Sequence, residues 1–497
     1  MIKRIFFKAL LIFLVLSVSN WLYKTWFFES DIQEHAPIVN LVRNIPKDAR
    51  IVYFGESSND TFSGDDLDKS SIADFIGRFY PEMKLYGITK HAAHAGVFKV
   101  LIEHIPENHS IKTLVVTMNL RSFNAQWIYS DLETALQKSL VLLKPYPPLV
   151  NRFLLSFKAY DIKTPEERAQ QVQKQWAKDL FKLPFSFPFK NVNEWDAHVW
   201  KEGVKNPDGT SNDALKELKC HYIKAYAFQI DTLNNPRIQD FDHIVKLAKR
   251  RNWNIVFNIV AENTQKAYEL VGPELVFMMN ENAQLLDAYF SRKGAVVVNN
   301  LNAVAHDEFI DQNWTTEHYG EFGRRTIARQ VAVELKRWHA ENFRQSSINE
   351  KFKTEFFNDC EGGTPWGQSH TISDEKAYSG KFASRVFAGN DYSITWEYPL
   401  SKVPDSLKNS ICLSFRFFKA CKIDQAILVI EAQGEHLDNY WLGFKLDQVA
   451  NAVNQWTLFK KKLKIDNRLR HADLIKIYVY NPTKMKLYVD DFHIRLD

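Results

Sequence analysis

The sequence predicts an α/β domain with a parallel sheet, preceded by one membrane-spanning helix and followed by an all-β domain. Three observations predict this. Apolar runs of strand length alternate with helical patterns up to about residue 343, short strand-like runs follow from about residue 352, and an apolar stretch behind basic residues opens the chain. At 497 residues the chain is also too long for one ordinary core, so two or three domains are expected.

The α/β domain is expected at 47–345, with a central parallel sheet. Parallel strands are buried on both faces and read as near-continuous apolar runs, and helical patterns between them complete the three layers. A proline-rich segment at about 125–235 breaks this rhythm and is expected to be an insertion at the sheet edge or a lid over the site. The predicted strands are 51–54, 83–88, 113–118, 254–260 and 295–298, and the predicted helices are 96–104, 240–250, 263–289 and 322–343.

The first 28 residues predict a membrane anchor. Basic residues within the first eight positions precede the apolar run 9–18, and aromatic residues follow it up to residue 28. Positive charge before an apolar stretch keeps the N-terminus in the cytoplasm and sends the rest across. We therefore expect one helix in the inner membrane, a connector at 29–46 and a periplasmic bulk. A signal peptide cleaved near Ser19 is the alternative.

Charge and cysteine content exclude two classes of site. The net charge of +5 is small, and no dense basic run lies on one predicted face, so nucleic-acid binding is not expected. The four cysteines form no zinc-binding pattern. Cys412 and Cys421 could form a disulfide in an oxidising compartment, or could be two buried thiols.

Polar residues follow several of the predicted strands, where a parallel sheet gathers its reactive groups. Ser57 comes just after the first strand, behind Gly55. Asn119 and Arg121 follow the third strand and could bind an oxyanion and an anionic or polyol substrate. His318 lies just ahead of the last helix and is the best-placed base for a serine, with His91 and His94 as weaker alternatives.

This arrangement resembles the SGNH (GDSL-like) hydrolase family, in particular its extracytoplasmic acyltransferase branches related to alginate-acetylation and DltD-like proteins. Residues 51–57 are similar to the first family block, which carries the nucleophile at Ser57. Gly96 and Asn119 are similar to the oxyanion residues of the middle blocks, and residues 315–328 resemble the block of the catalytic His318. Over residues 48–342 the resemblance implies a flavodoxin-like three-layer domain with no catalytic cofactor.

The sequence departs from this family at the acid. The family's aspartate stands three residues before the histidine, where this chain has Thr315. Asp311 and Glu317 are the substitutes, and Asp311 is preferred because its loop is long enough to fold back.

Residues 352–497 are expected to form a β-sandwich or jelly roll, because short strand-like runs alternate with polar turns. This region resembles a carbohydrate-binding module. Trp366, Trp396, Trp441 and Trp456 could stack on sugars, with core packing as the ordinary alternative. Asp359, Glu361 and Asp491 could hold a structural calcium ion, or could be ordinary carboxylates at strand ends.

Two functions are therefore expected. The first is serine-dependent transfer of an acyl group, with acetyl expected, or ester hydrolysis on a cell-envelope or exported polysaccharide, with a membrane acyl-donor protein as a partner. The second is a catalytically degenerate protein that binds polysaccharide or assists its assembly.

Overall fold

The architecture comes from a computed structural model. It describes residues 2–344 except 65, 67 and 207, and residues 355–496 except 362–365, 401–402, 404–407, 435–439, 450–452 and 471. The chain divides into two compact units, Met1–Asn342 and Phe343–Asp497. Each unit has its own hydrophobic core.

The first unit is built on a five-stranded sheet in which every pairing is parallel. The strand order is β2-β1-β3-β4-β5, which is the flavodoxin-like order. All five predicted strands are confirmed, with small shifts at their ends. They are β1 (Ile51–Gly55), β2 (Leu85–Thr89), β3 (Thr113–Met118), β4 (Asn254–Ile259) and β5 (Val296–Asn299).

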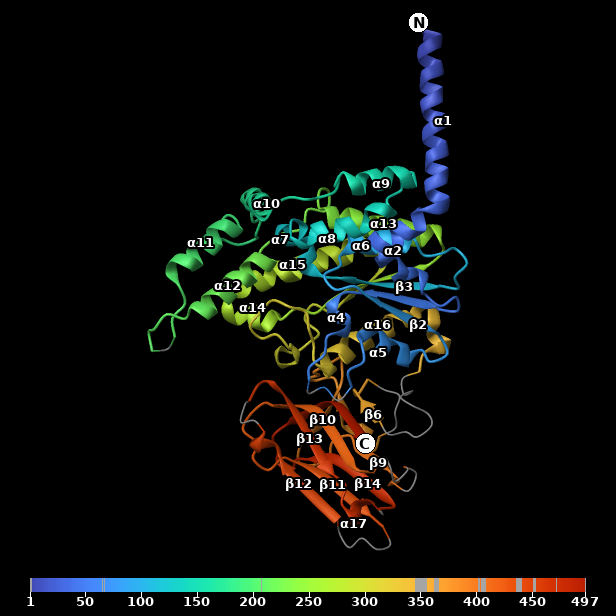
Figure 1. Ribbon diagram of the computed structural model, residues 1–497. Helices are drawn as coiled ribbons and strands as arrows, with labels where there is room; N and C mark the ends of the chain where they lie inside the picture. Colours follow the sequence, from blue (N-terminus) through green and yellow to red (C-terminus); the bar gives the residue numbers. More distant parts are fainter. Residues whose placement is uncertain are drawn as a thin grey trace. The chain divides into compact units, whose positions relative to one another are not determined.

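Helices cover both faces of this sheet (Figure 1). One layer contains α6 (Ala95–Glu103), α13 (Pro236–Arg250) and α15 (Pro273–Ser291), and the other contains α5 (Ile72–Phe79) and α16 (Glu321–His339). Side chains of β1 and β3 alternate between the layers, as the strand period of two requires. The large core includes Val52, Phe54, Leu114 and Val116 together with residues of α6, α13 and α15.

One sequence prediction in this unit was wrong, and the predicted connector contains short helices. Residues 263–289 form two helices, α14 (Thr264–Leu270) and α15, because Gly272 has φ +132° and Pro273 begins α15. The expected polar connector at 29–46 contains α2 (Phe28–His35) and α3 (Asn40–Arg43). Both are held by apolar side chains, since Ile32 and Val42 are fully buried in the core.

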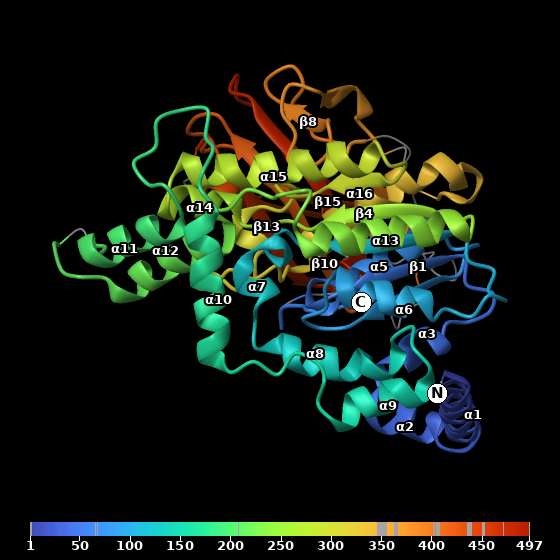
Figure 2. The same cartoon turned by 90° about the horizontal axis from the view of Figure 1, so that it is seen from above.

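The predicted insertion at 125–235 is mainly helical in its described part, and Figure 2 shows it spreading away from the sheet. Its last long helix, α12, contacts α14 and α15. The helices are α7 (Ala125–Ile128), α8 (Leu132–Leu140), α9 (Pro148–Ser156), α10 (Pro165–Lys178), α11 (Val192–Glu202) and α12 (Asp213–Tyr226).

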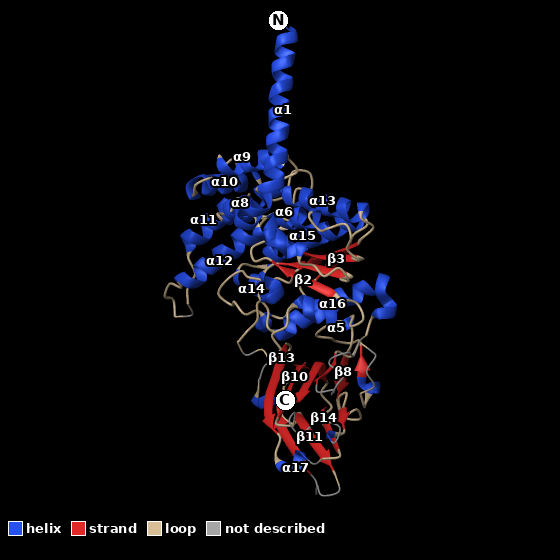
Figure 3. Ribbon diagram, turned by 45° about the vertical axis from the view of Figure 1, so that its right-hand side comes forward, coloured by secondary structure: helices blue, strands red, loops and turns tan. Residues whose placement is uncertain are grey.

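The second unit consists mainly of strands, shown in red in Figure 3. It contains two antiparallel sheets, one with β6, β7, β8, β10, β13 and β15 and the other with β9, β11, β12 and β14. Phe415 and Phe492 from the first sheet share a core with Ile430 and Ile477 from the second. The strands are β6 (Glu355–Asn358), β7 (Ile372–Ser373), β8 (Ala383–Val386), β9 (Trp396–Tyr398), β10 (Ser410–Lys419), β11 (Ile427–Gln433), β12 (Tyr440–Lys445), β13 (Trp456–Lys464), β14 (Leu474–Tyr480) and β15 (Leu487–Leu496), with a short helix α17 (Asn467–Arg470).

The N-terminal helix α1 (Ile2–Trp26) is the one helix among the described residues that is long and apolar enough to cross a membrane. The apolar 18-residue window within Arg4–Trp26 contains no buried residue, and Tyr23, near the end that enters the first unit, is buried. A membrane span and a signal sequence share these properties. The four cysteines, all within the described part of the chain, form no disulfide, so the suggested bridge between Cys412 and Cys421 is absent.

Candidate active site

The candidate site lies where the order of the parallel strands reverses. In the sheet, β1 lies between β2 and β3: the chain passes from β1 to β2 on one side and later returns to β3 on the other side. In such sheets, ligands bind beyond the carboxyl ends of the strands at this point. Ser57 begins the short helix α4 (Ser57–Asp60) directly after β1, and Asn119 follows β3. Gly55 is needed at this turn, because a Cβ there would lie 2.7 Å from Cβ of Asn59 and 2.8 Å from the Tyr53 ring.

The structure brings Ser57, His318 and Asp311 into one hydrogen-bonded chain. Nε2 of His318 lies 3.0 Å from Oγ of Ser57, and Nδ1 of the same ring lies 2.7 Å from Oδ2 of Asp311. The side chains of His318 and Asp311 are 22% and 38% exposed, so solvent and small substrates can reach them. This is the order of contacts that a nucleophile, a base and an orienting acid require.

Asp311 reaches His318 because the loop between them folds back on itself. Phe309 and Tyr319 form an isolated antiparallel bridge, and the N–H of Ile310 donates to the carbonyl of His318 at 2.9 Å. Pairing of these two arms places Asp311 beside the imidazole, and Thr316 Oγ1 donates to the same carboxylate oxygen at 2.6 Å. Of the two acids left open by the sequence, Asp311 therefore contacts the histidine.

A buried arginine fastens the loop after Ser57 to the helix after His318. Arg324, at the start of α16, is fully buried. Its guanidinium donates to Asp66 Oδ2 at 2.8 Å and to the carbonyls of Asp68, Ser70 and Tyr319 at 2.7, 3.0 and 2.8 Å. Because these bonds tie the loop that follows Ser57 to the segment that follows His318, they fix the separation between the two residues.

Behind the serine lies a buried cluster of three carboxylates and one guanidinium. Arg121 makes a bidentate ion pair with Glu317, and both side chains are less than a tenth exposed. Asn119 Nδ2 donates to Glu56 Oε1 at 2.6 Å, and the backbone N–H of Arg121 donates to Asn119 Oδ1 at 2.9 Å. The expected role of Arg121 in contacting substrate is therefore not supported, because its guanidinium is buried and paired with Glu317.

The third carboxylate, Glu262, was missed by the sequence analysis. It follows β4, and Tyr226 on α12 donates to its Oε2 at 2.5 Å. The same rule that selected Ser57 and Asn119, reading the residues after each strand, would have found it. This contact joins the helical insertion to the cluster. A second contact links the insertion to the site: His221 on α12 packs against Trp314 of the loop that carries His318, with ring centroids 4.0 Å apart. The predicted lid function of the insertion stays a prediction.

Burial and mutual repulsion keep part of this cluster protonated. Burial, followed by the nearby charge of Glu317, raises the pKa of Glu56 from 4.5 to about 8. The same two causes, in the same order, raise the pKa of Glu262 well above 4.5. One guanidinium cannot neutralise three buried carboxylates, so the cluster retains protons at neutral pH.

Replacing Glu56 is expected to change how stability depends on pH. The folded state holds a proton on Glu56 between about pH 4.5 and 8, whereas the unfolded state has released it. The contribution of Glu56 to the unfolding free energy is therefore fully present below pH 4.5, and it is lost as the pH rises towards 8. In the wild type, this group should lower the unfolding free energy of the first unit by up to about 1.4 kcal/mol for each pH unit in this range. Glu56→Gln should abolish that part of the pH dependence.

Urea unfolding from pH 5 to 8 measures this difference. Glu202→Gln, at an exposed position at the end of α11, is the matched control and should retain the wild-type pH dependence. Equal slopes for wild type and Glu56→Gln would contradict the protonation assigned to Glu56.

The structure uses Gly96 for packing rather than presenting it to the serine. Its N–H donates to Nδ1 of His94 at 3.1 Å, and a Cβ would lie 2.9 Å from Oδ2 of Asp240. An N–H occupied in this way does not serve as an oxyanion donor, contrary to the prediction. His94 itself is buried against Glu133, and exposed His91 lies 3.0 Å from Asp60.

The tryptophans of the second unit differ in exposure. Trp396 is 2% exposed and packs on Phe356 and Tyr398, so its predicted role in sugar stacking was wrong. Trp366 is also buried. Trp441, on the edge strand β12, is 54% exposed and keeps a face available for stacking.

The predicted calcium ligands make protein contacts in the described structure. Glu361 Oε1 accepts the N–H groups of Lys381 and Phe382, Asp491 Oδ1 accepts the Ser379 hydroxyl, and Asp359 Oδ1 accepts the N–H of Glu361. Within the described residues, the group of side chains close enough to share an ion is instead Asp31, Glu34 and His35. Calcium at Asp359, Glu361 and Asp491 stays a prediction.

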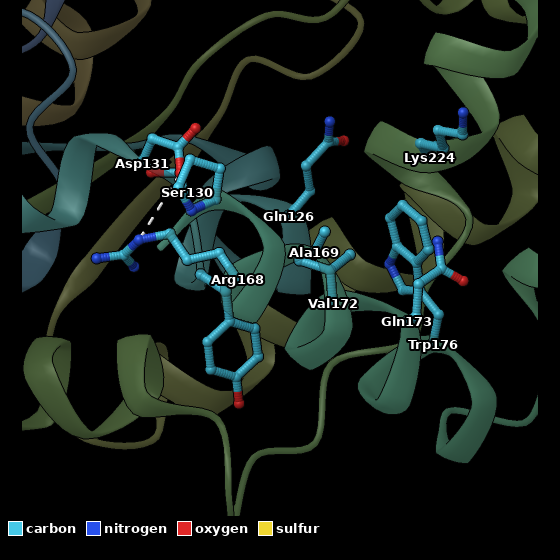
Figure 4. Close-up of a pocket in the computed structure, with 11 residues that line it drawn as sticks. Gln126, Ser130, Asp131, Arg168, Ala169, Val172, Gln173, Trp176 and Lys224 are labelled. Atoms are coloured by element: carbon cyan, nitrogen blue, oxygen red, sulfur yellow. Dashed lines mark ion pairs between the residues drawn. The ribbon is translucent and has the colours of Figure 1, made fainter. Parts of the chain in front are cut away.

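A cavity of about 400 Å³ lies in the helical insertion (Figure 4), and its lining residues include no member of the Ser57 triad. Arg168 and Trp176 of α10 line it, with Asp131 and Lys224 on neighbouring segments. Its charged groups are engaged, since Arg168 lies 3.2 Å from Asp161 and Lys224 lies 3.2 Å from Asp196. The cavity contributes no side chain to the triad.

Comparisons with known proteins find likeness over part of the chain. The likeness is to carbohydrate-binding modules. The CBM22-1 xylan-binding domain of Paenibacillus barcinonensis Xyn10C is 16% identical with a TM-score of 0.21, over 28% of this chain and 92% of that one. The C-terminal family 22 module of Clostridium thermocellum Xyn10B is 15% identical with a TM-score of 0.22, over 30% and 96%. TmCBM61, solved in complex with β-1,4-galactotriose, is 9% identical with a TM-score of 0.17, over 29% and 90%. No protein-family model and no curated protein matches the chain.

Proposed function

We propose that the chain is a membrane-anchored, serine-dependent acyl-transfer enzyme of the SGNH type that acts on an extracytoplasmic polysaccharide. The observation that carries this proposal is the hydrogen-bonded chain from Ser57 through His318 to Asp311. An imidazole held between a hydroxyl and a carboxylate is the arrangement that turns a serine into a nucleophile.

The chemistry follows from these contacts. Ser57 Oγ attacks the carbonyl carbon of an acyl ester, and His318 Nε2 takes the hydroxyl proton while Asp311 stabilises the imidazolium. The backbone N–H groups at the start of α4 stabilise the oxyanion, together with the second N–H of the Asn119 amide, whose first N–H donates to Glu56. The tetrahedral intermediate then expels the alcohol, which receives the proton from His318. This leaves the acyl group esterified to Ser57.

The second half-reaction determines the type of enzyme. His318 takes a proton from the acceptor hydroxyl, which attacks the acyl-serine, and the proton returns to Ser57 Oγ as the product leaves. A sugar hydroxyl as acceptor gives an O-acyltransferase, and water gives an esterase. Acetyl is the acyl group we propose, supplied to a transferase by a membrane donor protein.

The polysaccharide part of the proposal rests on the second unit and its exposed Trp441, since aromatic faces stack on sugar rings. Similarities with TM-scores near 0.2 add no argument to it. Helix α1 supplies the anchor, with Lys3, Arg4 and Lys8 on the cytoplasmic side and both units beyond the membrane.

Labelling with a fluorophosphonate tests the nucleophile directly. The full chain in detergent should be labelled stoichiometrically, and peptide mapping should place the adduct on Ser57. Labelling should be lost in Ser57→Ala and strongly slowed in His318→Gln, because the serine then lacks its base.

The neighbouring Ser58 provides a matched control for this experiment. It belongs to the same helix, but it is buried and its Oγ lacks a hydrogen-bond partner within the described residues. Ser58→Ala should therefore label like the wild type. A folded wild-type chain that takes up no probe, or takes it up at another serine, would favour the non-catalytic polysaccharide-binding function.

A further inference from the structure

The outward side of α9 is apolar although it is exposed. Val150, Phe153 and Phe157 are 42%, 46% and 78% exposed, and Tyr146, just before the helix, is 54% exposed. The spacing of three and four residues places Val150, Phe153 and Phe157 along one helical stripe. We call this stripe, together with the nearby Tyr146, the α9 face. The opposite side of α9 is already in use, because Leu155 is buried in the core. The α9 face is therefore a second apolar side that the first unit does not cover.

Hydrogen bonds and an ion pair hold α9 at the base of α1. The N–H of Leu149 donates to Oδ1 of Asn20 at 3.0 Å. Asp31 on α2 joins the two helices, because it accepts the Tyr23 hydroxyl at 2.6 Å and lies 2.8 Å from Nε of Arg152. Figures 1 and 2 both show α9 beside the end of α1 that enters the first unit. The α9 face therefore has a fixed level relative to α1.

That level corresponds to the surface of a bilayer. The apolar part of α1 has 23 residues, or about 34 Å at 1.5 Å per residue, against about 30 Å for the hydrocarbon core. Asn20, which bonds α9, lies six residues before the end of this stretch at Trp26, or about 9 Å along the helix. Interfacial helices bury their apolar face about 5–10 Å into the boundary between headgroups and acyl chains.

The residues around this level suit the same environment. Trp21 and Trp26 are 60% and 66% exposed on α1, and tryptophan prefers the membrane interface. Lys158, directly after Phe157, is exposed, and so is Lys24 on α1 between Trp21 and Trp26. Lysine at this level is attracted to anionic headgroups.

We propose that the α9 face inserts into the extracytoplasmic surface of the bilayer that α1 crosses, between the headgroups and the upper acyl chains. Helix α1 alone would leave the first unit free to tilt about a single attachment. A second contact through α9 fixes the orientation of the α/β unit against the membrane. This inference rests on α1 spanning a membrane, as proposed above, and is independent of the chemistry of Ser57.

Depth-dependent quenching of a fluorophore tests the contact in the full chain, reconstituted in nanodiscs of phosphatidylcholine and phosphatidylglycerol. Cys421→Ser provides the background, since the other three cysteines are buried. Bimane is attached at Phe153→Cys on the α9 face, at Leu14→Cys in the middle of α1, or at Tyr268→Cys on α14. Leu14 and Tyr268 are both 58% exposed, so they serve as the embedded and the aqueous reference.

The label at position 153 should be quenched several-fold more strongly than the label at 268 by nitroxide lipids with the probe near the headgroup, and several-fold less by aqueous iodide. Position 14 is read with lipids that carry the nitroxide deep in the acyl chain, because it lies in the middle of α1. Quenching at 14 by these lipids, without quenching of the label at 153 by either lipid, would overturn the inference and leave the anchor intact. Absence of quenching at 14 by the deep nitroxide would contradict the anchor as well. Protection at 153 without lipid quenching, together with disulfide formation between two Phe153→Cys chains, would assign the face to a second copy and also overturn it.

Discussion

Ser57→Ala is expected to lower kcat/KM for a soluble acyl ester such as 4-nitrophenyl acetate by about 10⁴- to 10⁶-fold, the range found when a serine nucleophile is removed. The loss should appear mainly in kcat, because the hydroxyl enters a bond only after the ester has bound. Loss of Oγ leaves His318 and Asp311 in place, so folding should be unaffected.

The comparison with Ser58→Ala separates chemistry from packing. Both substitutions remove one hydroxyl from the same helix, but Ser58 Oγ is buried and is not hydrogen-bonded to His318. Ser58→Ala should retain activity within a factor of a few. An equal loss in both variants, or turnover unchanged in Ser57→Ala, would show that Ser57 is not the nucleophile.

The strands of the first unit could be predicted because burial on both faces leaves a local mark in the sequence. Residues 113–118 are apolar or small throughout, and all six are buried in β3. Strand β12, by contrast, is a sheet edge with most of its side chains exposed, so it lacks the alternation that marks a half-buried strand. The order of the strands in the sheet is set by long-range packing and has no local signal.

The candidate site was predictable where chemistry follows a strand, and Asp311 was preferred over Glu317 because its loop is long enough to fold back. Ser57 and His318 could be found from their places beside β1 and α16. The contact of Asp311 with His318 depends on pairing of Phe309 with Tyr319, which residue type does not reveal. Arg121 was assigned to substrate because an arginine at a strand end suits an anion, but the anion that it meets is the protein's own Glu317.

Arg121→Met is expected to destabilise the first unit by about 3–5 kcal/mol, the usual loss when one member of a buried ion pair is removed. Glu317 would then remain buried without its guanidinium, beside Glu56 and Glu262, whose pKa values are already raised by burial. Part of the loss should be relieved at low pH, where the carboxylates take up protons. Urea unfolding of the full chain in detergent at pH 5 and pH 8 measures both effects.

Two further variants identify the cause of this loss. Arg43→Met removes an arginine whose pair with Glu29 is 37% and 63% exposed, and it should cost no more than about 1 kcal/mol. Arg121→Met combined with Glu317→Gln removes both charges and should recover much of the stability lost in the single variant. If Arg121→Met were no more destabilising than Arg43→Met, the cluster would not depend on its guanidinium. If the double variant recovered nothing, the loss would come from packing around the arginine stem rather than from an uncompensated charge.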